Sequence, residues 1–454
     1  MGKIRILGIA GPVLLTLFWA FTAAAQGAVL LPEPGQFPNT SKITIGATHG
    51  QTLPVRLTIR EAYRLAREHY PSSRQRDLIE KTKEFSVENA AKGYLPQLSF
   101  NGQATLQSDV TTLPVKVPIA GFNLPSYSKD QYRLYAEIDQ VLYDGGAISN
   151  QQQAARVSAL IGQQSLIVEL HGLFDRVNQL YFGVLLLEEQ LKQNDLLQED
   201  IQNGIDKLRA MVDNGTAYRS GIDELAAQLL QAGQSRTEEQ VARKAYLDML
   251  TLFTGAVLDD HLPLAEPPEL PLQQTISRPE WLLFEYQKRN YDLQEEIADA
   301  QVRPRFSLFL QGGYARPALN MLSNDFAWYY IGGIRISWNL AGYYTLKRVR
   351  SITETGRRSL DLQKETFLLN TAVEARLASG DVAKYADLIS KDENIIRLRT
   401  SVKEAALAQL TNGVLNAHDY LSQVIAEDKA RQNLILHRVQ LLQSEYNYQT
   451  IVGQ

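Results

Sequence analysis

The sequence predicts a mixed α and β chain in which long helices of the coiled-coil type alternate with four short strands. Two patterns indicate this class: apolar residues recur at steps of three and four over long proline-free stretches, and four segments alternate between apolar and polar positions. A third observation is an internal repeat, because Pro71 and Pro96 recur as Pro279 and Pro304 at one common offset. The same order of elements is therefore expected twice.

Composition excludes several classes of function. A net charge of −4 and a pI near 6.0 give no basic face for nucleic acid. The absence of cysteine removes disulfides, thiolate metal sites and a cysteine nucleophile. The six histidines are scattered without ligand spacing, and no nucleotide-binding or hydrolase motif is present. We expect no catalytic residue, no metal site and no cofactor, and therefore not an enzyme.

The first 25 residues have the pattern of a cleavable secretory signal. Lys3 and Arg5 precede an apolar run over 6–21, and Ala23 and Ala25 have the spacing of a cleavage site. The alternative is a retained single-span anchor, but the run is shorter than the about 20 residues that a bilayer needs. We expect export of the mature chain, followed by an extended lead-in over 26–56 that is rich in Pro, Gly and Thr.

The first repeat is predicted over 57–255. Its first helix starts at Thr58, with Glu61 completing a capping box, and it continues with a break at Pro71 until about Gly93. A strand follows directly after Pro96, and a second strand covers 132–143.

The second repeat is predicted over 278–454, after a proline-rich connection over 256–277. A helix again meets a strand at Pro304, and a fourth strand covers 328–339. Proline lacks a backbone N–H, so it ends a helix and can begin a strand. We expect the junctions between helices and strands at the residues Gly93, Pro96, Gly146, Pro304 and Gly342.

The four strands could belong either to a soluble β-sandwich or to a membrane β-barrel. Alternation usually indicates a soluble sandwich with one face in a core. Here, however, each strand is about as long as a tilted strand that spans a bilayer. The fourth strand also carries aromatic residues at both ends, as interfacial girdles do; these are Trp328, Tyr329, Tyr330 and Trp338. Four strands cannot close a membrane barrel, and open edges are not tolerated in lipid. Two copies would supply eight strands and three copies twelve.

Long helical hairpins are predicted after each strand pair. A proline-free stretch over 147–213 has one apolar stripe and turns at Asn214 and Gly215. A matching pair over 347–411 and 417–450 turns at Asn412 and Gly413.

Taken in order and twice, these motifs resemble the TolC-type outer-membrane efflux proteins. The residues that carry the resemblance are YLPQLSF, YDGG at 143–146, the Gly…Asp-x-Leu turns and RPEW. The resemblance covers roughly 57–453. It implies a long α-helical coiled-coil barrel joined to a transmembrane β-barrel that is completed by trimerisation. It also implies a bacterial outer-membrane location, with the helical part in the periplasm.

The resemblance further implies partners and a gate. The partners are outer-membrane lipid, a periplasmic adaptor protein at the four turn residues, and an inner-membrane transporter. Asp223 and Asp419 match the carboxylates that narrow the entrance, although Ser422 stands where a second carboxylate is expected. The alternative for each Asp is a plain helix N-cap.

The function implied is an exit duct that passes small molecules or proteins from an inner-membrane pump to the exterior. The sequence leaves open a type I protein secretion duct, and it also leaves open a periplasmic coiled-coil scaffold whose strands form a soluble sheet.

Overall fold

The computed structural model describes residues 56–110, 128–256, 258, 264–273, 275–320 and 323–453. All of them belong to one structural unit, Gly50–Gln454. The predicted signal at 1–25, the lead-in up to residue 55, and part of the connection lie outside the described residues. The repeat boundaries stay a prediction.

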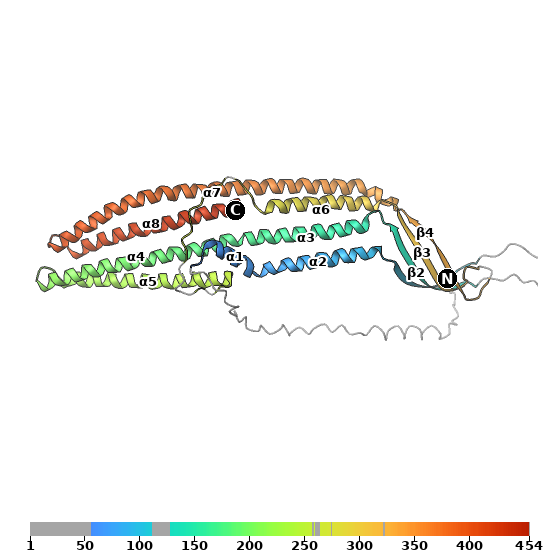
Figure 1. Cartoon of the computed structure of the whole chain (residues 1–454), viewed down its shortest axis with the longest axis horizontal. Coiled ribbons are helices and arrows are strands. Elements are labelled where there is room, and N and C mark those ends of the chain that lie inside the picture. The colour runs from blue at the N-terminus through green and yellow to red at the C-terminus, as the bar shows by residue number, and fades with distance from the viewer. Residues whose placement is uncertain are drawn as a thin grey trace, which may run out of the picture. The chain divides into compact units, whose positions relative to one another are not determined.

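A helix–strand–strand–helix order occurs twice along the chain (Figure 1). The first set comprises α1 (Ile59–His69), α2 (Gln75–Ala91), β1 (Gln97–Leu106), β2 (Asp130–Tyr143), α3 (Ala147–His171), α4 (Leu173–Asp213) and α5 (Arg219–Thr254). The second set comprises α6 (Glu280–Gln301), β3 (Arg305–Arg316), β4 (Ala327–Ser337), α7 (Tyr343–Thr411) and α8 (Ala417–Val452). Short 3₁₀ turns cover Pro71–Arg74, Lys92–Tyr94 and Leu340–Gly342.

The helices lie side by side in two rows that follow one another along the molecule and share α7. Near the sheet the row is α2, α3, α6 and α7, and towards the far turns it is α5, α4, α8 and α7 (Figure 1). At about 1.5 Å per residue, the 69 residues of α7 extend for roughly 100 Å without interruption.

The other helices are interrupted where the two rows meet. The stretch over 147–213, predicted as continuous, is divided at Gly172, whose N–H donates to the Val168 carbonyl oxygen. The break at Pro71 lies at the same height, because Ser72 Oγ donates to Glu169 Oε1 at 2.7 Å. The start of α6 lies there too, because the Gln164 side chain donates to the Pro279 carbonyl oxygen at 2.8 Å, and so does the end of α8, whose Val452 carbonyl oxygen accepts from the Ser277 N–H at 2.7 Å.

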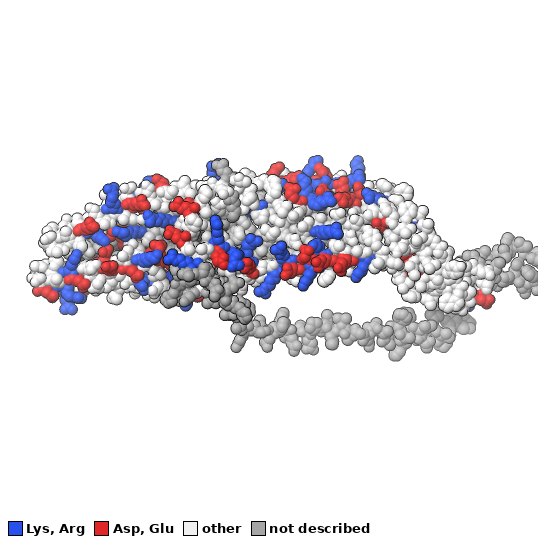
Figure 2. Space-filling model, viewed as in Figure 1, with Lys and Arg blue, Asp and Glu red and all other residues white. Residues whose placement is uncertain are grey.

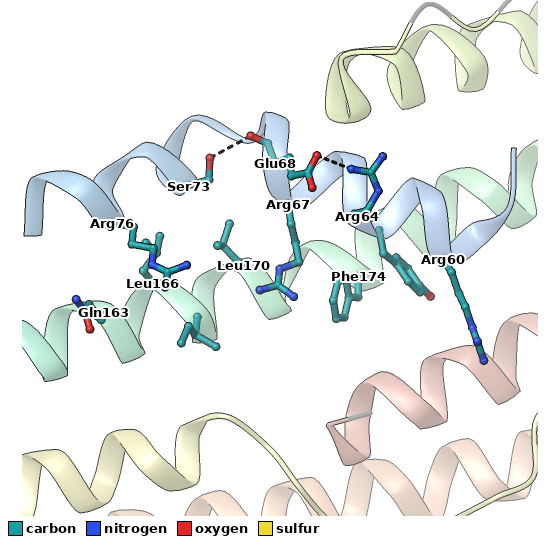
Figure 3. A pocket seen from close by; sticks show the side chains of 12 residues that line it. Arg60, Arg64, Arg67, Glu68, Ser73, Arg76, Gln163, Leu166, Leu170 and Phe174 are labelled. Atoms are coloured by element: carbon teal, nitrogen blue, oxygen red, sulfur yellow. Dashed lines mark hydrogen bonds and ion pairs between the residues drawn. The ribbon is translucent and has the colours of Figure 1, made fainter. Parts of the chain in front are cut away.

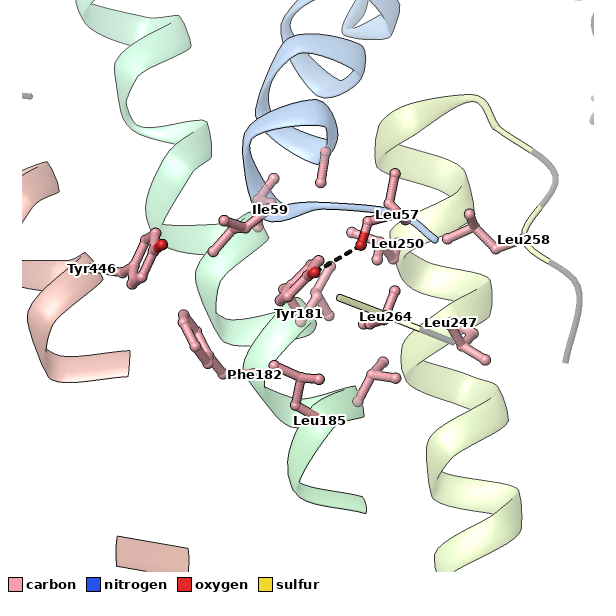
Figure 4. Close-up of a cluster of buried hydrophobic side chains, with 14 of the residues drawn as sticks. Leu57, Ile59, Tyr181, Phe182, Leu185, Leu247, Leu250, Leu258, Leu264 and Tyr446 are labelled. Carbon is pink, nitrogen blue, oxygen red and sulfur yellow. Dashed lines mark hydrogen bonds between the residues drawn. The ribbon is translucent and has the colours of Figure 1, made fainter. Parts of the chain in front are cut away.

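A hydrophobic core fixes these interrupted helices to one another. It joins α1, α4, α5 and α8 to the connection, and it includes Leu57, Ile59, Phe182, Leu250, Leu264 and Tyr446 (Figure 4). Tyr181 is fully buried, and its hydroxyl lies 2.8 Å from the carbonyl oxygen of Leu57 and 2.6 Å from that of Ala265. The predicted cap at Thr58 is confirmed, since its Oγ1 accepts from the Glu61 N–H at 3.3 Å. The Glu61 carboxylate binds Arg64.

The sheet has the strand order β1-β2-β3-β4, and all pairs are antiparallel. The four observed strands begin and end within a few residues of the predicted ones. The register places Leu98 opposite Ile138, Ile138 opposite Leu310, and Leu310 opposite Gly332. One face of all four strands is therefore apolar. β1 and β4 are the edge strands.

Candidate functional site

The apolar face of the sheet is exposed along its whole width. Phe100 on β1 is 77% exposed and Trp328 on β4 is 82% exposed. Other exposed members of this face are Leu98, Leu106, Leu134, Leu308, Leu310, Tyr330, Ile334 and Ile336. The strands pack principally against one another and not against the long helices in the described chain. A soluble sandwich, which needs this face in a core, does not fit.

The opposite face of the sheet is polar and carries an ion-pair network. Arg335 on β4 donates to Glu137 Oε1 at 2.8 Å and to Asp139 Oδ2 at 2.9 Å, both on β2. Its guanidinium also lies 4.6 Å from the ring centroid of Phe309. Ser307 Oγ donates to Asp139 Oδ2 at 3.1 Å. Apart from the ion pair of Asp130 and Arg316, which lies in the apolar-face rows at one end of β2 and β3, the charged groups of the sheet lie on the face that an aqueous lumen would wet.

The predicted aromatic girdle is only partly on the apolar face. Trp328 and Tyr330 lie on that face, whereas Tyr329 pairs with Gly313 in the polar-face rows, so its assignment to the girdle is wrong. Successive residues of a strand face opposite sides, so the residue between Trp328 and Tyr330 has to lie on the polar face. At the other end of β4, Trp338 is about half exposed, and its indole N–H donates to the Val302 carbonyl oxygen at 2.8 Å.

The junction residues lie where helices meet strands. Gly146 has φ +95° immediately before α3, a conformation that favours glycine. Gly93 and Gly342 are close-packed: an added Cβ would lie 2.9 Å from Ile148 Cδ1 and 2.7 Å from Val302 Cγ1, respectively. Pro96 and Pro304 directly precede β1 and β3.

The two far turns have the same construction. Gly215 and Gly413 have φ +73° and +72°. Asn214 and Asn412 each donate from Nδ2, at 2.8 Å, to the carbonyl oxygen four residues earlier. A cavity of about 450 Å³ lies between the two hairpin ends and is lined by residues from both turns. Beside it, Gly221 of α5 packs so closely on α8 that an added Cβ would lie 2.8 Å from Ala417 Cβ.

Asp223 and Asp419 are both exposed near this end of the helices. The N-cap position itself is wrong for Asp419, because Asn416 is the N-cap of α8 and accepts from the Asp419 N–H at 2.8 Å, but Asp419 does lie in the first turn of that helix. It is also wrong for Asp223, since α5 begins at Arg219. Neither carboxylate makes an ion pair within the described part of one copy.

Sequence reasoning missed a contact between a histidine and a glutamate that joins the two hairpins. His418 Nδ1 on α8 lies 2.6 Å from Glu224 Oε1 on α5. The hydrogen bond to Glu224, with the negative charges of Glu224 and Asp419, raises the pKa of His418. No sequence pattern could have found the pair, because its members belong to different repeats.

A groove rich in arginine lies where α1 and α2 cross α3 (Figure 3). It has a volume of about 660 Å³ and an apolar floor that includes Leu166, Leu170 and Phe174. Its cationic side chains are Arg60, Arg64, Arg67 and Arg76, and the Arg64 guanidinium binds both Glu61 and Glu68. The α1 arginines are spaced by four and three residues, which places them on one face of a helix, and this spacing could have been read from the sequence.

Charged side chains cover the visible face of the helices, whereas the sheet region is almost free of them (Figure 2). Within the described ranges, no three His, Cys, Asp or Glu side chains gather as a metal ion would require. The described helices include none with the length and apolar character needed to cross a membrane.

Comparisons with known proteins establish the fold. No family model matches the chain, and no curated protein matches it. Similar solved structures include CusC, described for folding and transmembrane channel formation, with TM-score 0.65 and 17% identity over 87% of this chain and 92% of that one. Another is the outer membrane protein VceC of Vibrio cholerae, with TM-score 0.63 and 14% identity over 87% and 96%.

The MtrE outer membrane channel of Neisseria gonorrhoeae in its open state is also similar, with TM-score 0.60 and 14% identity over 89% of this chain and 94% of that one. The chain therefore has the fold of these outer-membrane channels. The fold predicted from the resemblance, with four strands per chain and long helical hairpins, is confirmed.

Proposed function

We propose that the chain is a subunit of an outer-membrane exit duct, with its helical part in the periplasm. The observation that carries this proposal is the sheet: its apolar face is exposed across four strands, and its charges lie on the other face except for the Asp130–Arg316 pair at one end. In water such an exposed apolar face would favour aggregation, whereas in a bilayer it is the surface that contacts lipid.

The assembly we propose is a homotrimer. The edge strands β1 and β4 leave backbone groups unpaired, and lipid offers them no hydrogen bonds. Pairing β4 of one copy with β1 of the next satisfies both edges. Two copies would give eight strands and three would give twelve. The sequence resemblance favours the twelve-stranded barrel.

The proposed partners are a periplasmic adaptor at the far turns and an inner-membrane transporter. The cavity between the two hairpin ends, next to Gly413 and Asp419, is a concave surface into which part of the adaptor could bind. We propose small molecules, including toxic compounds, as the first cargo class, driven by a proton-coupled pump. A type I protein secretion system is the second candidate. The duct carries no energy source of its own, so it offers no feature that separates the two kinds of export.

Fractionation of the full chain expressed with its own leader tests this function. The mature chain should sediment with outer membranes, need detergent for extraction, and have a mass near three times 51.0 kDa less the leader. In planar bilayers it should form ion-conducting pores. Recovery as a soluble monomer would remove the duct and favour a periplasmic scaffold instead.

A further inference from the structure

The groove between α1, α2 and α3 has the composition of a binding site, and the proposed duct gives it no role (Figure 3). Its volume of about 660 Å³ falls within the about 300–1,000 Å³ that is usual for small-molecule sites in proteins. It lies where the two helical rows meet, away from both the sheet and the far turns (Figure 1). The groove is therefore a separate surface of the molecule.

The floor of the groove is apolar and partly aromatic. Leu166 and Leu170 on α3 are buried in it, and Ile167 between them is 44% exposed. Tyr63 and Phe174 add two rings whose centroids are 4.6 Å apart. Such a floor gains free energy by contact with a hydrocarbon part of a ligand, which a bare inorganic ion does not have.

The cationic side chains of the groove come from two helices. Arg60, Arg64 and Arg67 are spaced by four and three residues, which places them on one face of α1. Arg76 adds a fourth guanidinium from α2. In Figure 3, Arg67 extends from α1 into the groove, beside Leu170. Positive charge is thus held next to the apolar floor.

The carboxylates beside these arginines are already bound to other groups. Glu61 and Glu68 both bind Arg64, and Glu68 Oε2 accepts from its guanidinium at 2.7 Å. Glu80, one turn after Arg76 on α2, binds Lys83. None of these acidic side chains is left to neutralise the rest of the groove.

Three guanidiniums therefore line the groove without a counter-charge. Arg60, Arg67 and Arg76 form no ion pair within the part of the chain that the structure describes. A guanidinium is planar and can donate two parallel hydrogen bonds to one carboxylate or phosphate. The apolar part of a ligand would also exclude water from these bonds, which strengthens them.

The lead-in before α1 is a poor source of the missing anion. Residues 26–55 contain one acidic residue, Glu33, and also one lysine, Lys42. The charge and the floor of the groove together fit a separate molecule that carries an anionic head on an apolar body.

We propose that this groove binds a small anionic amphiphile. Its carboxylate or phosphate head accepts hydrogen bonds from Arg67 and Arg76. Its hydrocarbon part lies on Leu166, Ile167 and Leu170. The site lies within one copy of the chain, so the inference goes beyond the proposed duct and does not depend on the trimer.

Photolabelling of the full chain in phosphatidylcholine vesicles tests the site. The probe is decanoate with a diazirine near the end of its chain, and mass spectrometry then locates the labelled peptides. Labelling is expected in the α3 and α4 segment 163–174, which carries the floor. Decanol with the same diazirine, which lacks the charge, should label this segment at least about tenfold less, as expected for the loss of one charge-assisted hydrogen bond.

The variant R67Q/R76Q should lower labelling of the segment by at least about tenfold for the same reason. R67K/R76K keeps the positive charges and should retain part of the labelling. The matched control is R74Q: Arg74 is exposed in the turn before α2 but does not line the groove. Labelling of R74Q should equal that of the wild type.

Competition separates an amphiphile from a free anion. Decyl phosphate should displace the probe, whereas inorganic phosphate at the same concentration should not, because it makes no contact with the apolar floor. Equal competition by both would overturn the amphiphile and leave a plain anion site.

The remaining outcomes contradict the site itself. Equal labelling of R67Q/R76Q and the wild type, or labelling of the sheet alone, would mean that the arginines only cover the floor with their aliphatic stems. Dissociation of the assembly in R67Q/R76Q would make the groove a contact with a second copy and would also overturn the proposal. Recovery of the wild type as a soluble monomer overturns the duct alone, since the groove belongs to one copy.

Discussion

The imidazole of His418 and the carboxylate of Glu224 join the ends of the two helical hairpins, with Nδ1 and Oε1 2.6 Å apart. Because Glu224 raises the pKa of His418, the charged pair holds below that pKa and is lost as the pH rises through it. The hairpin ends are therefore held together more firmly in acid.

Single-channel conductance should accordingly rise as the pH increases through the pKa of His418, which lies above the ordinary histidine value. H418Q should abolish this dependence. The control is H437Q, since His437 makes a similar contact with Asp392, Nδ1 to Oδ2 2.6 Å, but within one hairpin. An unchanged pH profile in H418Q would show that the pair has no part in the entrance.

The exposed carboxylates of Asp223 and Asp419 should set the ion preference of the entrance. Three copies of each around an axis attract cations and repel one another. D223A/D419A should raise the conductance and lower the cation preference, measured as reversal potential in a salt gradient. Asn416 supplies the cap of α8, so the melting temperature should change little. Unaltered conductance and selectivity would leave both residues outside the gate.

Arg335 should control the charge of the barrel lumen. R335Q leaves Glu137 and Asp139 without their shared cation, adding one unbalanced negative charge per copy. Selectivity for cations should increase, and R335Q/E137Q should return it towards the wild-type value. If the reversal potential does not move in R335Q, this network does not face the conducting path.

A partly buried carboxylate should make the helical part more stable in mild acid. Glu239 Oε2 on α5 is buried without a hydrogen-bond partner in the described chain. Burial, together with the charges of Asp428 and Asp195, raises the pKa of Glu239. Stability is therefore gained as the pH falls towards that pKa and is lower above it.

E239Q should raise the melting temperature at neutral pH and flatten its dependence on pH. The control E238Q alters the exposed neighbour and should do neither. Equal pH profiles for E239Q and the wild type would contradict this account.

Tyr181 should anchor the connection between the repeats. Y181F removes a buried hydroxyl that contacts the carbonyl oxygens of Leu57 and Ala265, which should cost about 1 kcal/mol of unfolding free energy. Limited proteolysis should then cut the connection faster than in the wild type. Y218F, at an exposed tyrosine, is the control. Equal cleavage rates would show that the hydrophobic core alone holds the connection.

Local patterns were sufficient to predict the strands and turns, because alternation and glycine placement are properties of a few neighbouring residues. The same alternation, followed strictly, would have placed Tyr329 on the polar face. The break at Gly172 had no such signal, since this residue has φ −63° and any residue could adopt it. The contact between His418 and Glu224 depends on packing between repeats, which periodicity does not contain.

The interruption of every helix but α7 at one height has a mechanical consequence. At that level the described chain passes from one helix to another at Gly172 and at Pro71, and α8 ends beside the start of α6. Of the described helices, only α7 continues as a single helix from Thr411 to Tyr343, next to the last strand. Within one copy, α7 is therefore the one uninterrupted helical path between a far turn and the sheet.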